Sequence, residues 1–521
     1  MEASPPPSDE EISPPKNINN PLELNLGAAG ALLLGENELR LSQDSGTAPG
    51  TARIVEETQD PGCCGLGRKG HGQLPNTILY YDILWAELRD FVLTISYAQR
   101  IRKTATLHTL VISIPAASVS EASEFIERLI DRAYNSSSFK SQPRKRIKVL
   151  INPHGGRGRA AKIYSKHIEP FFKAAACQIE VEHTTHHKHG EEIAQRLNIE
   201  DFDVVACCSG DGLPHEVFNG LAKQKYPRRA LRKLAVCQLP CGSGNGMSWN
   251  LNGTDDPALA ALTVVKGVRM PMDLVSVTQG NTRTLSFLSQ AVGIIAECDL
   301  GTEDLRWMGD TRFTIGYVKR LMTKTIWPVD VAIGTAISET NEIKRAYHHV
   351  HSEISKRPDT IPDVSLTLLS EDDSANDLPT LRFGSINDAL PDTWLMKPYP
   401  NLGNFYAGNM AYMTANSNVF PTSLPADGLM DLICVNGDIS RRRAMQLADA
   451  TGSGALIDSA DVKYQKIVGY RIVPRQKDGY ISIDGERIPF GGFQAEVHHG
   501  LGTVLGKVGG IYMAKGPSSV E

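Results

Sequence analysis

The sequence has no apolar run long enough to cross a bilayer as a helix, which takes roughly 20 residues. The best candidate, Leu26 to Leu34, is short and is interrupted by glycine and alanine. Met1 to Lys16 is acidic and rich in proline and serine, a composition that excludes a signal or transit peptide. We therefore expect a cytoplasmic protein, and we expect any association with an intracellular or plasma membrane to be peripheral.

The sequence also lacks a strong charge of one sign and lacks paired cysteines. Its net charge is −5 and its basic runs are short, which argues against a nucleic-acid partner. The nine cysteines form no CxxC pair, so neither a disulfide framework nor a zinc knuckle is expected. Cys63 and Cys64 lie in a glycine-rich basic loop and are either ordinary thiols or sites of reversible S-acylation. A zinc site is not expected in the histidine-rich loop, because the loop lacks a plausible geometry for a fourth ligand. Its histidines are His183, His186, His187 and His189.

The N-terminal part of the chain contains two kinds of segment. Residues 1–20 are rich in proline and serine and are expected to be disordered. Residues 21–143 contain alternating segments followed by one amphipathic stretch, Glu121 to Tyr134. Antiparallel strands closed by a helix are the order found in pleckstrin-homology (PH) modules, so a small PH-like α+β module is expected here. The alternating segments are Glu38 to Leu41, Thr77 to Leu84, Phe91 to Ser96 and Thr106 to Ser113.

The pattern changes at residue 144, where short apolar strands begin to alternate with helix-like stretches. This alternation is typical of βα units, and it predicts a parallel sheet over residues 144–268. From 269 to 515, strand patterns separated by turns predict a β-rich second domain, and the largely polar stretch 338–397 is interpreted as a surface insertion in it. The parallel strands are expected at Ile147 to Ile151, Gln178 to Glu182, Val204 to Cys208 and Leu234 to Leu239. The later strands include Leu274 to Val277, Val364 to Leu369, Leu432 to Val435, Ile467 to Ile472 and Tyr480 to Ile483.

The first expected parallel strand runs directly into a glycine-rich segment, Asn152 to Arg159, and helix-forming residues follow. Glycines let backbone N–H groups approach phosphate oxygens, and the start of a helix adds unpaired donors and a positive dipole end. The segment is not a Walker loop, because no Gly-Lys-Ser/Thr follows it. It does satisfy the relaxed dinucleotide fingerprint, with Glu182 as a possible ribose ligand. An NAD-dependent oxidoreductase and a purely structural turn therefore both stay open at this point.

Two further glycine-rich turns follow expected parallel strands, at Ser209 to Gly212 and at Pro240 to Gly246. The carboxyl ends of parallel strands meet at one edge of a sheet, where α/β folds bind their ligands, so nucleotide binding is favoured. An aspartate between glycines is usually a turn residue. Asp211, however, ends a strand beside a phosphate-binding crevice, which makes it a candidate to accept a proton from a hydroxyl group.

Taken together, these turns resemble the diacylglycerol-kinase-type catalytic domain. The fuller strings SGDGLPHE, from Ser209 to Glu216, and LPCGSGN, from Leu239 to Asn245, resemble the sphingosine kinase (long-chain-base kinase) branch of that superfamily. The resemblance covers roughly residues 147–495, with further matches at 287–290, 296–299, 306–309 and 483–486. It implies a Rossmann-like α/β domain of the diacylglycerol-kinase type followed by an antiparallel β-sandwich that holds the lipid.

The resemblance also implies a lipid kinase that uses ATP and Mg²⁺ to phosphorylate the primary hydroxyl of sphinganine, phytosphingosine or sphingosine. Asp211 would be the general base, and Asp299 would recognise the amine of the sphingoid base. Ceramide or diacylglycerol as the acceptor is the alternative. The residues implied to bind ATP are Asn152, Pro153, His154, Gly155, Gly156, Gly158, Thr184, Ser209, Gly210, Glu216, Gly242, Ser243, Gly244, Asn245, Arg306, Arg312, Asp484, Gly485 and Glu486. Those implied to bind the lipid are Gly212, Leu213, Pro214, His215, Ser289 and Asp299.

Several of these residues also have structural interpretations. Asp484-Gly485 is a strong hairpin signal, and Arg306 and Arg312 are equally compatible with charges on a helix surface. Position 154 is histidine where many relatives in the family carry arginine or lysine. A catalytically inactive lipid-binding protein would be expected to have lost the carboxylate or the glycine loop, and the sequence keeps both.

One later segment, Arg312 to Trp327, mixes large apolar residues with lysine and arginine. A helix of this composition is usually half buried in a core. Our hypothesis is that it instead forms a lid at the lipid tunnel and touches the membrane with its apolar and basic groups.

Overall fold

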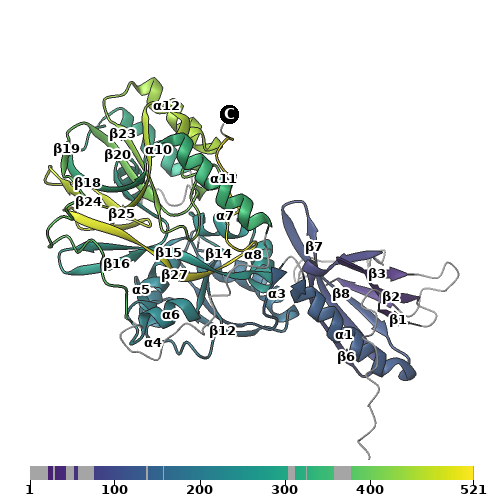
Figure 1. Ribbon diagram of the computed structural model, residues 1–521. Coiled ribbons are helices and arrows are strands. Elements are labelled where there is room, and N and C mark those ends of the chain that lie inside the picture. The colour runs from purple at the N-terminus through teal and green to yellow at the C-terminus, as the bar shows by residue number, and fades with distance from the viewer. Residues whose placement is uncertain are drawn as a thin grey trace, which may run out of the picture.

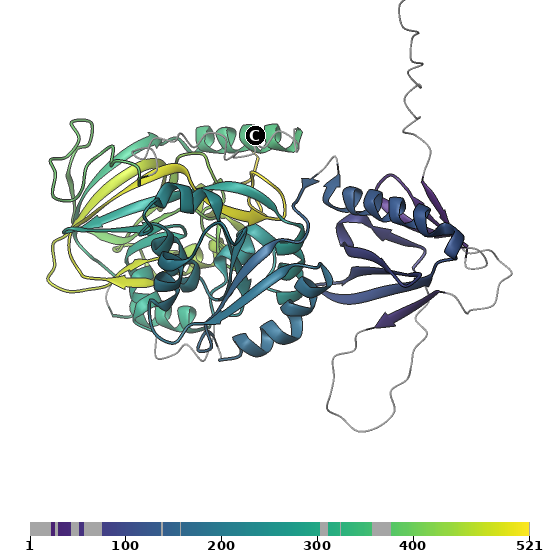
Figure 2. The same cartoon turned by 90° about the horizontal axis from the view of Figure 1, so that it is seen from below.

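The computed structural model describes residues 22–26, 30–42, 52–56, 75–136, 139–156, 158–302, 311–323, 325–356 and 377–519. The expectations for residues 1–20, for Cys63 and Cys64, for Arg306 and for the strand at 364–369 lie outside the described residues. Within those ranges, no helix is both long and apolar enough to cross a membrane. Figures 1 and 2 show the N-terminal module at one end of the molecule, beside the α/β part.

The described residues of the N-terminal module, between 22 and 136, form two antiparallel four-stranded sheets and one long helix, α1 (Val119–Tyr134). Its strands are β1 (Glu23–Asn25), β2 (Ala31–Leu34), β3 (Glu38–Ser42), β4 (Ala52–Glu56), β5 (Thr77–Leu79), β6 (Ile83–Arg89), β7 (Val92–Ile101) and β8 (Thr104–Ser113). The sheets have the orders β1-β2-β3-β5 and β4-β8-β7-β6. The predicted strands and helix are confirmed, although the segment from Thr77 to Leu84 holds parts of two strands separated by a helical turn. The relation to PH modules stays a prediction.

The α/β part begins after a two-stranded link, β9 (Asn135–Ser136) with β10 (Phe139–Lys140). Its parallel strands are β11 (Arg146–Ile151), β12 (Gln178–His183), β13 (Val204–Ser209) and β14 (Ala235–Pro240), which confirm the four predicted strands. Its helices are α2 (Ala160–Ile163), α3 (Glu169–Ala174), α4 (His189–Arg196), α5 (Gly212–Leu221), α6 (Pro227–Lys233), α7 (Gly246–Asn252) and α8 (Pro257–Lys266). The strand order is β12-β11-β13-β14. The chain adds β12 on one side of β11 and then adds β13 and β14 on the other side, so the order of strands switches between β11 and β13. Such a switch is where α/β sheets bind ligands.

The β-rich part contains most of the remaining strands. They are β15 (Val268–Gln279), β16 (Thr282–Ser286), β17 (Ser289–Gly293), β18 (Val329–Ile337), β19 (Lys397–Tyr399), β20 (Leu402–Gly408), β21 (Tyr412–Thr414), β22 (Ser417–Asn418), β23 (Met430–Asn436), β24 (Val462–Pro474), β25 (Ile481–Ile483), β26 (Glu486–Ile488) and β27 (Phe493–Gly506). Its helices are α9 (Ile294–Leu300), α10 (Thr311–Leu321), α11 (Thr340–Lys356) and α12 (Arg441–Ala450). Every predicted strand of this part that falls within the described residues is confirmed.

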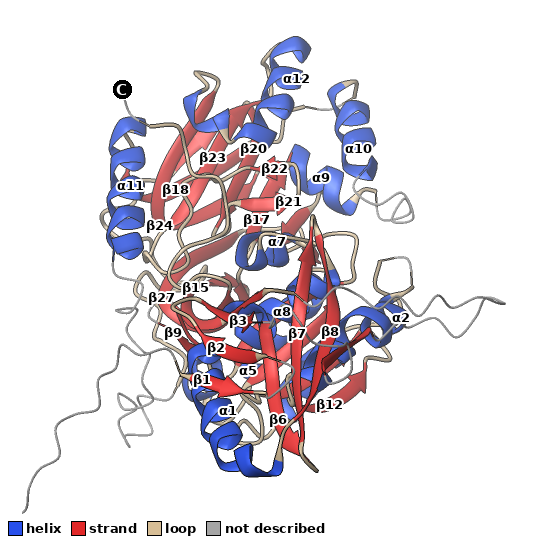
Figure 3. Cartoon of the chain, turned by 90° about the vertical axis from the view of Figure 1, so that its right-hand side faces the viewer, coloured by secondary structure: helices blue, strands red, loops and turns tan. Residues whose placement is uncertain are grey.

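The two parts share one sheet rather than meeting only through side chains. Strand β14 pairs in parallel with β27 at Val236 and Val504, and β27 pairs antiparallel with β15 and β24. Apart from β21 and β22, which pair with each other, the described strands of both parts therefore belong to one mixed sheet of 15 strands, with helices on its faces (Figure 3). A sandwich arrangement of the β-rich strands stays a prediction.

A continuous apolar core joins the N-terminal module to the α/β part. Phe125 of α1, Phe172 of α3 and Val264 of α8 belong to the same buried cluster. At this junction the buried Lys266 donates a hydrogen bond to the carbonyl of Ala133 at 2.8 Å. Burial lowers the pKa of Lys266, as expected for an ammonium group removed from water. The module is therefore packed onto the body of the protein rather than tethered to it.

The stretch predicted as a polar insertion, 338–397, contains a long helix that the sequence pattern did not reveal. This helix, α11, buries Ile343 and Tyr347, which lie four residues apart on one face. The half-buried Val350 and Ile354 continue this stripe at helical spacing, but the surrounding charged, histidine and serine residues led us to interpret the stretch from its polar composition.

Candidate active site

The three glycine-rich turns lie against one another at the carboxyl ends of β11, β13 and β14. A Cβ atom on Gly156, whose φ is +59°, would stand 2.7 Å from the carbonyl oxygen of Cys241. A Cβ on Gly242 would stand 2.2 Å from the backbone of Gly210. No side chain fits at either contact, because real Cβ atoms do not approach so closely. The turns therefore form a single backbone surface, as the sequence predicts.

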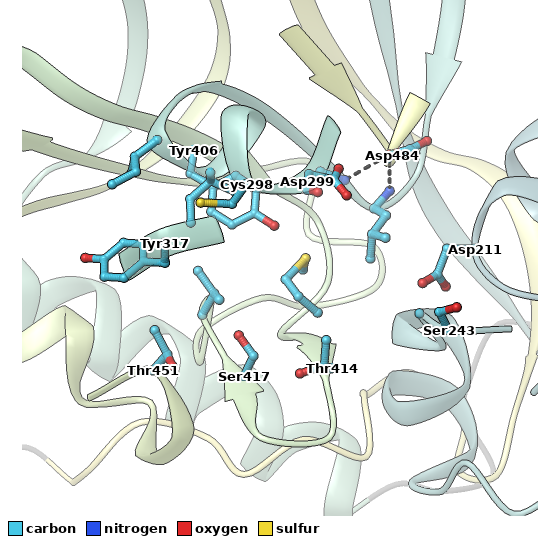
Figure 4. Close-up of a pocket in the computed structure, with 18 of the residues that line it drawn as sticks. Asp211, Ser243, Cys298, Asp299, Tyr317, Tyr406, Thr414, Ser417, Thr451 and Asp484 are labelled. Atoms are coloured by element: carbon cyan, nitrogen blue, oxygen red, sulfur yellow. Dashed lines mark hydrogen bonds between the residues drawn. The ribbon is translucent and has the colours of Figure 1, made fainter. Parts of the chain in front are cut away.

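This surface is one end of a large cavity of about 1320 Å³ that continues into the β-rich part (Figure 4). At the first end the walls are mostly backbone and small polar side chains. Toward the other end they are largely aliphatic, and the lining residues there include Ile294, Leu321, Val419, Ile433, Leu447 and Leu456. A polar compartment thus opens into an apolar channel, which suits a ligand with a charged head and a hydrocarbon chain.

Asp211 lies where the two compartments meet, and its carboxylate is held in place by the start of α7. The N–H of Gly246 donates to Oδ2 and the N–H of Met247 donates to Oδ1, both at 2.9 Å. Burial raises the pKa of Asp211, the two backbone hydrogen bonds lower it, and the charge of Asp484 raises it, with a net value of about 6. A carboxyl group with this pKa can accept a proton at neutral pH.

Two residues predicted to bind the nucleotide also stabilise the loops around this polar end through hydrogen bonds. Asn152 Oδ1 accepts a hydrogen bond from the backbone N–H of His154 at 3.0 Å, which fixes the first turn. The Glu216 carboxylate accepts from the N–H groups of Lys188 and Gly190, at 3.1 and 2.8 Å. Burial raises the pKa of Glu216, and these two hydrogen bonds lower it. Both side chains also line the cavity, so the same residues can shape the loops and face a ligand.

Asp484 has its carboxylate fully engaged by protein groups. It accepts hydrogen bonds from the Ser286 hydroxyl at 2.6 Å and from the backbone N–H of Leu288 and Ser289, both at 2.9 Å. It also lies 2.8 Å from Nδ1 of His215. Burial alone would lower the pKa of that histidine, but the hydrogen bond and charge of Asp484 raise it. The predicted hairpin turn after β25 is confirmed, and the Asp484 carboxylate ties it to the start of β17.

Glu486 is the acidic side chain of this hairpin that reaches the polar end of the cavity. A Cβ on Gly212 would stand 3.0 Å from Glu486 Oε1, which puts the carboxylate beside Asp211. In the part of the chain that the structure describes, no group of three or more His, Cys, Asp or Glu side chains could hold a metal ion. Mg²⁺ is usually bound by one or two carboxylates together with substrate phosphates and water, and Glu486 suits that role.

The start of the apolar channel carries a second carboxylate, Asp299, near the end of α9. Its Oδ2 accepts a hydrogen bond from the Ser482 hydroxyl of β25 at 2.7 Å. Ser289 and Tyr406 line the cavity close by, and the Ser289 side chain lowers the pKa of the Tyr406 phenol. Asp211 and Asp299 thus lie at successive points along the same cavity (Figure 4).

Helices α10 and α12 form the outer wall of the channel, and Figure 1 shows them side by side. The Tyr317 hydroxyl of α10 donates to the carbonyl of Ala444 in α12 at 2.9 Å. Arg320 pairs with the buried Glu297 of α9 at 2.7 Å. Two large apolar side chains of α10, Ile315 and Met322, are exposed and do not line the cavity, whereas the exposed Val318 and Met445 do line it.

Most of the predicted site residues that the structure describes line this one cavity. They are Asn152, His154, Gly155, Gly156, Thr184, Ser209, Gly210, Asp211, Gly212, Leu213, Glu216, Gly242, Ser243, Gly244, Ser289, Asp299, Asp484, Gly485 and Glu486. Among the predicted residues that do not line it are Pro153, Gly158, Pro214, His215 and Asn245. Arg312 lies in the first turn of α10, and Arg306 lies outside the described residues.

The sequence analysis missed Tyr406 and the cavity-facing side of α12. Tyr406 belongs to the almost wholly apolar strand β20, and nothing in that pattern separates it from a core tyrosine. Helix α12 begins with Arg441 to Arg443, one of the short basic runs, and such a run gives no sign that it borders a cavity. Only the neighbouring elements reveal that either segment borders the cavity.

Comparisons with known proteins agree with the motif resemblance. The diacylglycerol kinase catalytic domain family matches residues 146–277, and a family described as a domain of unknown function matches residues 22–135. Sphingoid long chain base kinase 4 of Schizosaccharomyces pombe is 32% identical over 439 residues, which cover 84% of this chain and 89% of that protein. Sphingoid long chain base kinase 5 of Saccharomyces cerevisiae is 30% identical over 429 residues, and this alignment covers 73% of this chain and 61% of that relative. A solved diacylglycerol kinase from Bacillus anthracis aligns with a TM-score of 0.44 and 16% identity over 69% of this chain and 96% of that one.

Proposed function

We propose that this chain, which belongs to the sphingoid long-chain base kinase family, transfers the γ-phosphoryl group of ATP to the primary hydroxyl of a sphingoid base. The products would be the 1-phosphates of sphinganine, phytosphingosine or sphingosine. The observation that carries the proposal is the single cavity, which joins a glycine-lined polar end to an apolar channel, with Asp211 where they meet. That arrangement brings a nucleotide and a lipid hydroxyl to the same carboxylate.

The nucleotide would bind at the glycine turns. Their backbone N–H groups and the starts of the following helices suit phosphate oxygens, and glycines of all three turns line the cavity. Asn152 and Thr184 line the same end and supply polar groups for the rest of the nucleotide. When bound, Mg²⁺ would neutralise charge on the transferring phosphates, and Glu486 would help to hold it.

Asp211 would act as the general base. An aliphatic hydroxyl does not ionise near neutral pH, so its proton must pass to a group within hydrogen-bond reach as the new bond to phosphorus forms. The carboxylate of Asp211 is mostly ionised at pH 7 and is held rigidly by Gly246 and Met247. Hydrogen bonds at both of its oxygens fix the direction from which it can accept the proton.

Asp299 would recognise the protonated amine next to the reacting hydroxyl. It is partly buried at the mouth of the apolar channel, where a charge-assisted hydrogen bond is stronger than in water. Ceramide and diacylglycerol lack the cation and would leave this carboxylate buried against a neutral group. Selection for a free sphingoid base over these neutral lipids therefore rests on Asp299.

The outer wall of the channel would contact the membrane from which the lipid is drawn. Exposed apolar side chains on α10 and α12 lie beside exposed cations that include Lys319, Arg441 and Arg442. This combination of apolar and basic groups favours the surface of an anionic bilayer. Binding there would be peripheral and would place the channel at the lipid headgroups.

The test is a phosphoryl-transfer assay in which radiolabelled ATP is offered with sphinganine, ceramide and diacylglycerol in parallel. We expect label in the sphinganine product and at most a few per cent of that rate with the other lipids. Label in ceramide or diacylglycerol but not in sphinganine would replace the proposed acceptor class. Absence of transfer to all three lipids would reject the kinase proposal.

A further inference from the structure

Tyr406 places a buried phenol hydroxyl in the wall of the cavity near Asp299. The residue lies on β20 directly opposite Ala291 of β17, and Ser289 lies two positions along β17 on the same face of the sheet. Because Ala291 has no side chain beyond Cβ, it leaves room for the phenol ring to extend toward Ser289. The ring also packs against Phe420, with centroids 5.1 Å apart. Its position is therefore fixed by both strands.

The electrostatic surroundings keep this hydroxyl protonated. Burial raises the pKa of Tyr406, the hydrogen bond with Ser289 lowers it, and the charges of Asp299, Asp484 and Asp211 raise it. A phenol hydroxyl offers one donor and acceptor capacity besides, and the neighbouring Ser289 hydroxyl could use only one of these. Since Tyr406 lines the cavity, its remaining capacity faces the space where the lipid would lie.

The chemistry of a sphingoid base defines which group would reach Tyr406. The base carries the reacting hydroxyl on C1, the amine on C2 and a hydroxyl on C3, and 4-hydroxylated bases carry a further hydroxyl on C4. With C1 at Asp211 and C2 at Asp299, the next carbons extend into the channel. Figure 4 shows Asp211, Asp299, Tyr406 and Tyr317 following one another along the cavity. The phenol of Tyr406 therefore lies beside the part of the lipid where its polar head ends and its hydrocarbon chain begins.

We propose that the hydroxyl of Tyr406 forms a hydrogen bond with the C4 hydroxyl of the substrate, so that this kinase prefers 4-hydroxylated sphingoid bases. The inference rests on the proposed function and specifies its substrate class. A base without the C4 hydroxyl would press a methylene group against the phenol and leave a buried polar group without one of its partners. Sites built to bind a substrate hydroxyl reject analogues that lack it for this reason.

The test measures discrimination between phytosphingosine, which is 4-hydroxysphinganine, and sphinganine itself. Both bases compete in one reaction, so the ratio of their kcat/KM values does not depend on the fraction of enzyme that is folded. The wild-type protein should favour phytosphingosine by about tenfold, and Tyr406→Phe should bring the ratio close to one. Tyr470→Phe is the matched control, because its buried hydroxyl contacts Gln290 at 3.4 Å and does not line the cavity. That variant should keep the wild-type ratio.

Two outcomes would overturn the inference while leaving the proposed function intact. One is a wild-type enzyme that phosphorylates both bases with equal kcat/KM. The other is a Tyr406→Phe variant that keeps the wild-type ratio, whatever its absolute rates, which would assign Tyr406 to packing alone. A wild-type protein that phosphorylates neither base would instead overturn the proposed function, and this inference with it.

Discussion

The two ends of the cavity are built in different ways. The polar end is formed mainly by the backbone of three short turns, and neighbouring turns approach so closely that a Cβ on Gly242 would stand 2.2 Å from Gly210. The apolar end is formed by side chains from elements far apart in the sequence, including β17, α9, α10, β20 and α12. A backbone surface tolerates almost no substitution, whereas an apolar wall accepts many side chains of similar volume. We therefore expect mutations at the polar end to abolish activity and mutations at the apolar end to reduce it gradually.

The largest effect is expected for Gly156→Asp. The new side chain would meet the carbonyl oxygen of Cys241, at 2.7 Å from Cβ, and would carry a negative charge into the proposed phosphate site. ATP affinity should fall by at least roughly a hundredfold and transfer activity should be lost, because like charges repel and the turns can no longer pack. Equilibrium binding of a fluorescent ATP analogue measures the change.

Gly280→Asp separates this effect from backbone strain. Gly280 also has a positive φ, +54°, but a Cβ there would meet nothing within 4 Å. This control should bind ATP as the wild type does and should lose only stability. If both variants lost affinity equally, strain rather than the phosphate site would be responsible.

The next largest effect is expected for Asp211→Asn. Asparagine keeps the size of the side chain and can still accept a hydrogen bond from the start of α7, but it cannot take up a proton. Turnover should fall by roughly 10² to 10⁴, while ATP binding stays close to the wild-type value. Single-turnover transfer of labelled phosphate, measured beside ATP affinity, distinguishes loss of chemistry from loss of binding. Activity within a factor of about three of wild type would remove Asp211 from the mechanism.

The pH profile gives an independent view of the same carboxylate. Burial raises the pKa of Asp211 to about 6, and a general base must be ionised to work. Wild-type kcat/KM should therefore fall about tenfold per pH unit below pH 6, and the remaining activity of Asp211→Asn should lack this limb. An identical acid limb in the variant would assign the titration to another group.

The difference between the two ends also explains how much could be predicted from the sequence. Each parallel strand was predicted to within one or two residues, because an apolar strand followed by a glycine turn is a contiguous pattern. Helix α11 was missed because the stretch was interpreted from its polar composition, although Ile343, Tyr347, Val350 and Ile354 recur at helical spacing. The pairing of β14 with β27 was missed because no local pattern links Val236 to Val504.

The residues of the candidate site also differ in how far the sequence alone predicts their position. Asp211 and its neighbours stand in contiguous motifs, so the sequence alone is enough to predict that they lie together. Tyr406 could not be predicted in this way, since its position depends on facing Ala291 across two strands more than one hundred residues apart. Asp484 is an intermediate case: its motif was recognised, yet only the folded chain reveals that Ser286 and the following amides occupy its carboxylate.

At the apolar end, Asp299→Asn should have a graded effect. Loss of a charge-assisted hydrogen bond worth about 1.5 to 3 kcal/mol should raise the apparent KM for sphinganine roughly ten- to a hundredfold, with ATP affinity unchanged. The rejection of diacylglycerol should weaken as well. Asp330→Asn is the control, because that exposed carboxylate pairs with Arg475 on the surface. A variant that kept both the wild-type KM and the rejection of diacylglycerol would move amine recognition away from Asp299.

The smallest effect is expected on the outer face of α10, and it compares two pairs of residues on one helix. Ile315 and Met322 are 41% and 62% exposed, whereas Tyr317 and Leu321 face the channel and α12. Replacing the outer pair by serine should lower activity on anionic liposomes by about three- to tenfold and leave activity on detergent-dispersed sphinganine nearly unchanged. Replacing the inner pair should lower both activities, because the channel wall itself is disturbed. Equal losses for the outer pair in both assays would show that α10 serves only as part of the core, and the membrane contact would then have to lie elsewhere.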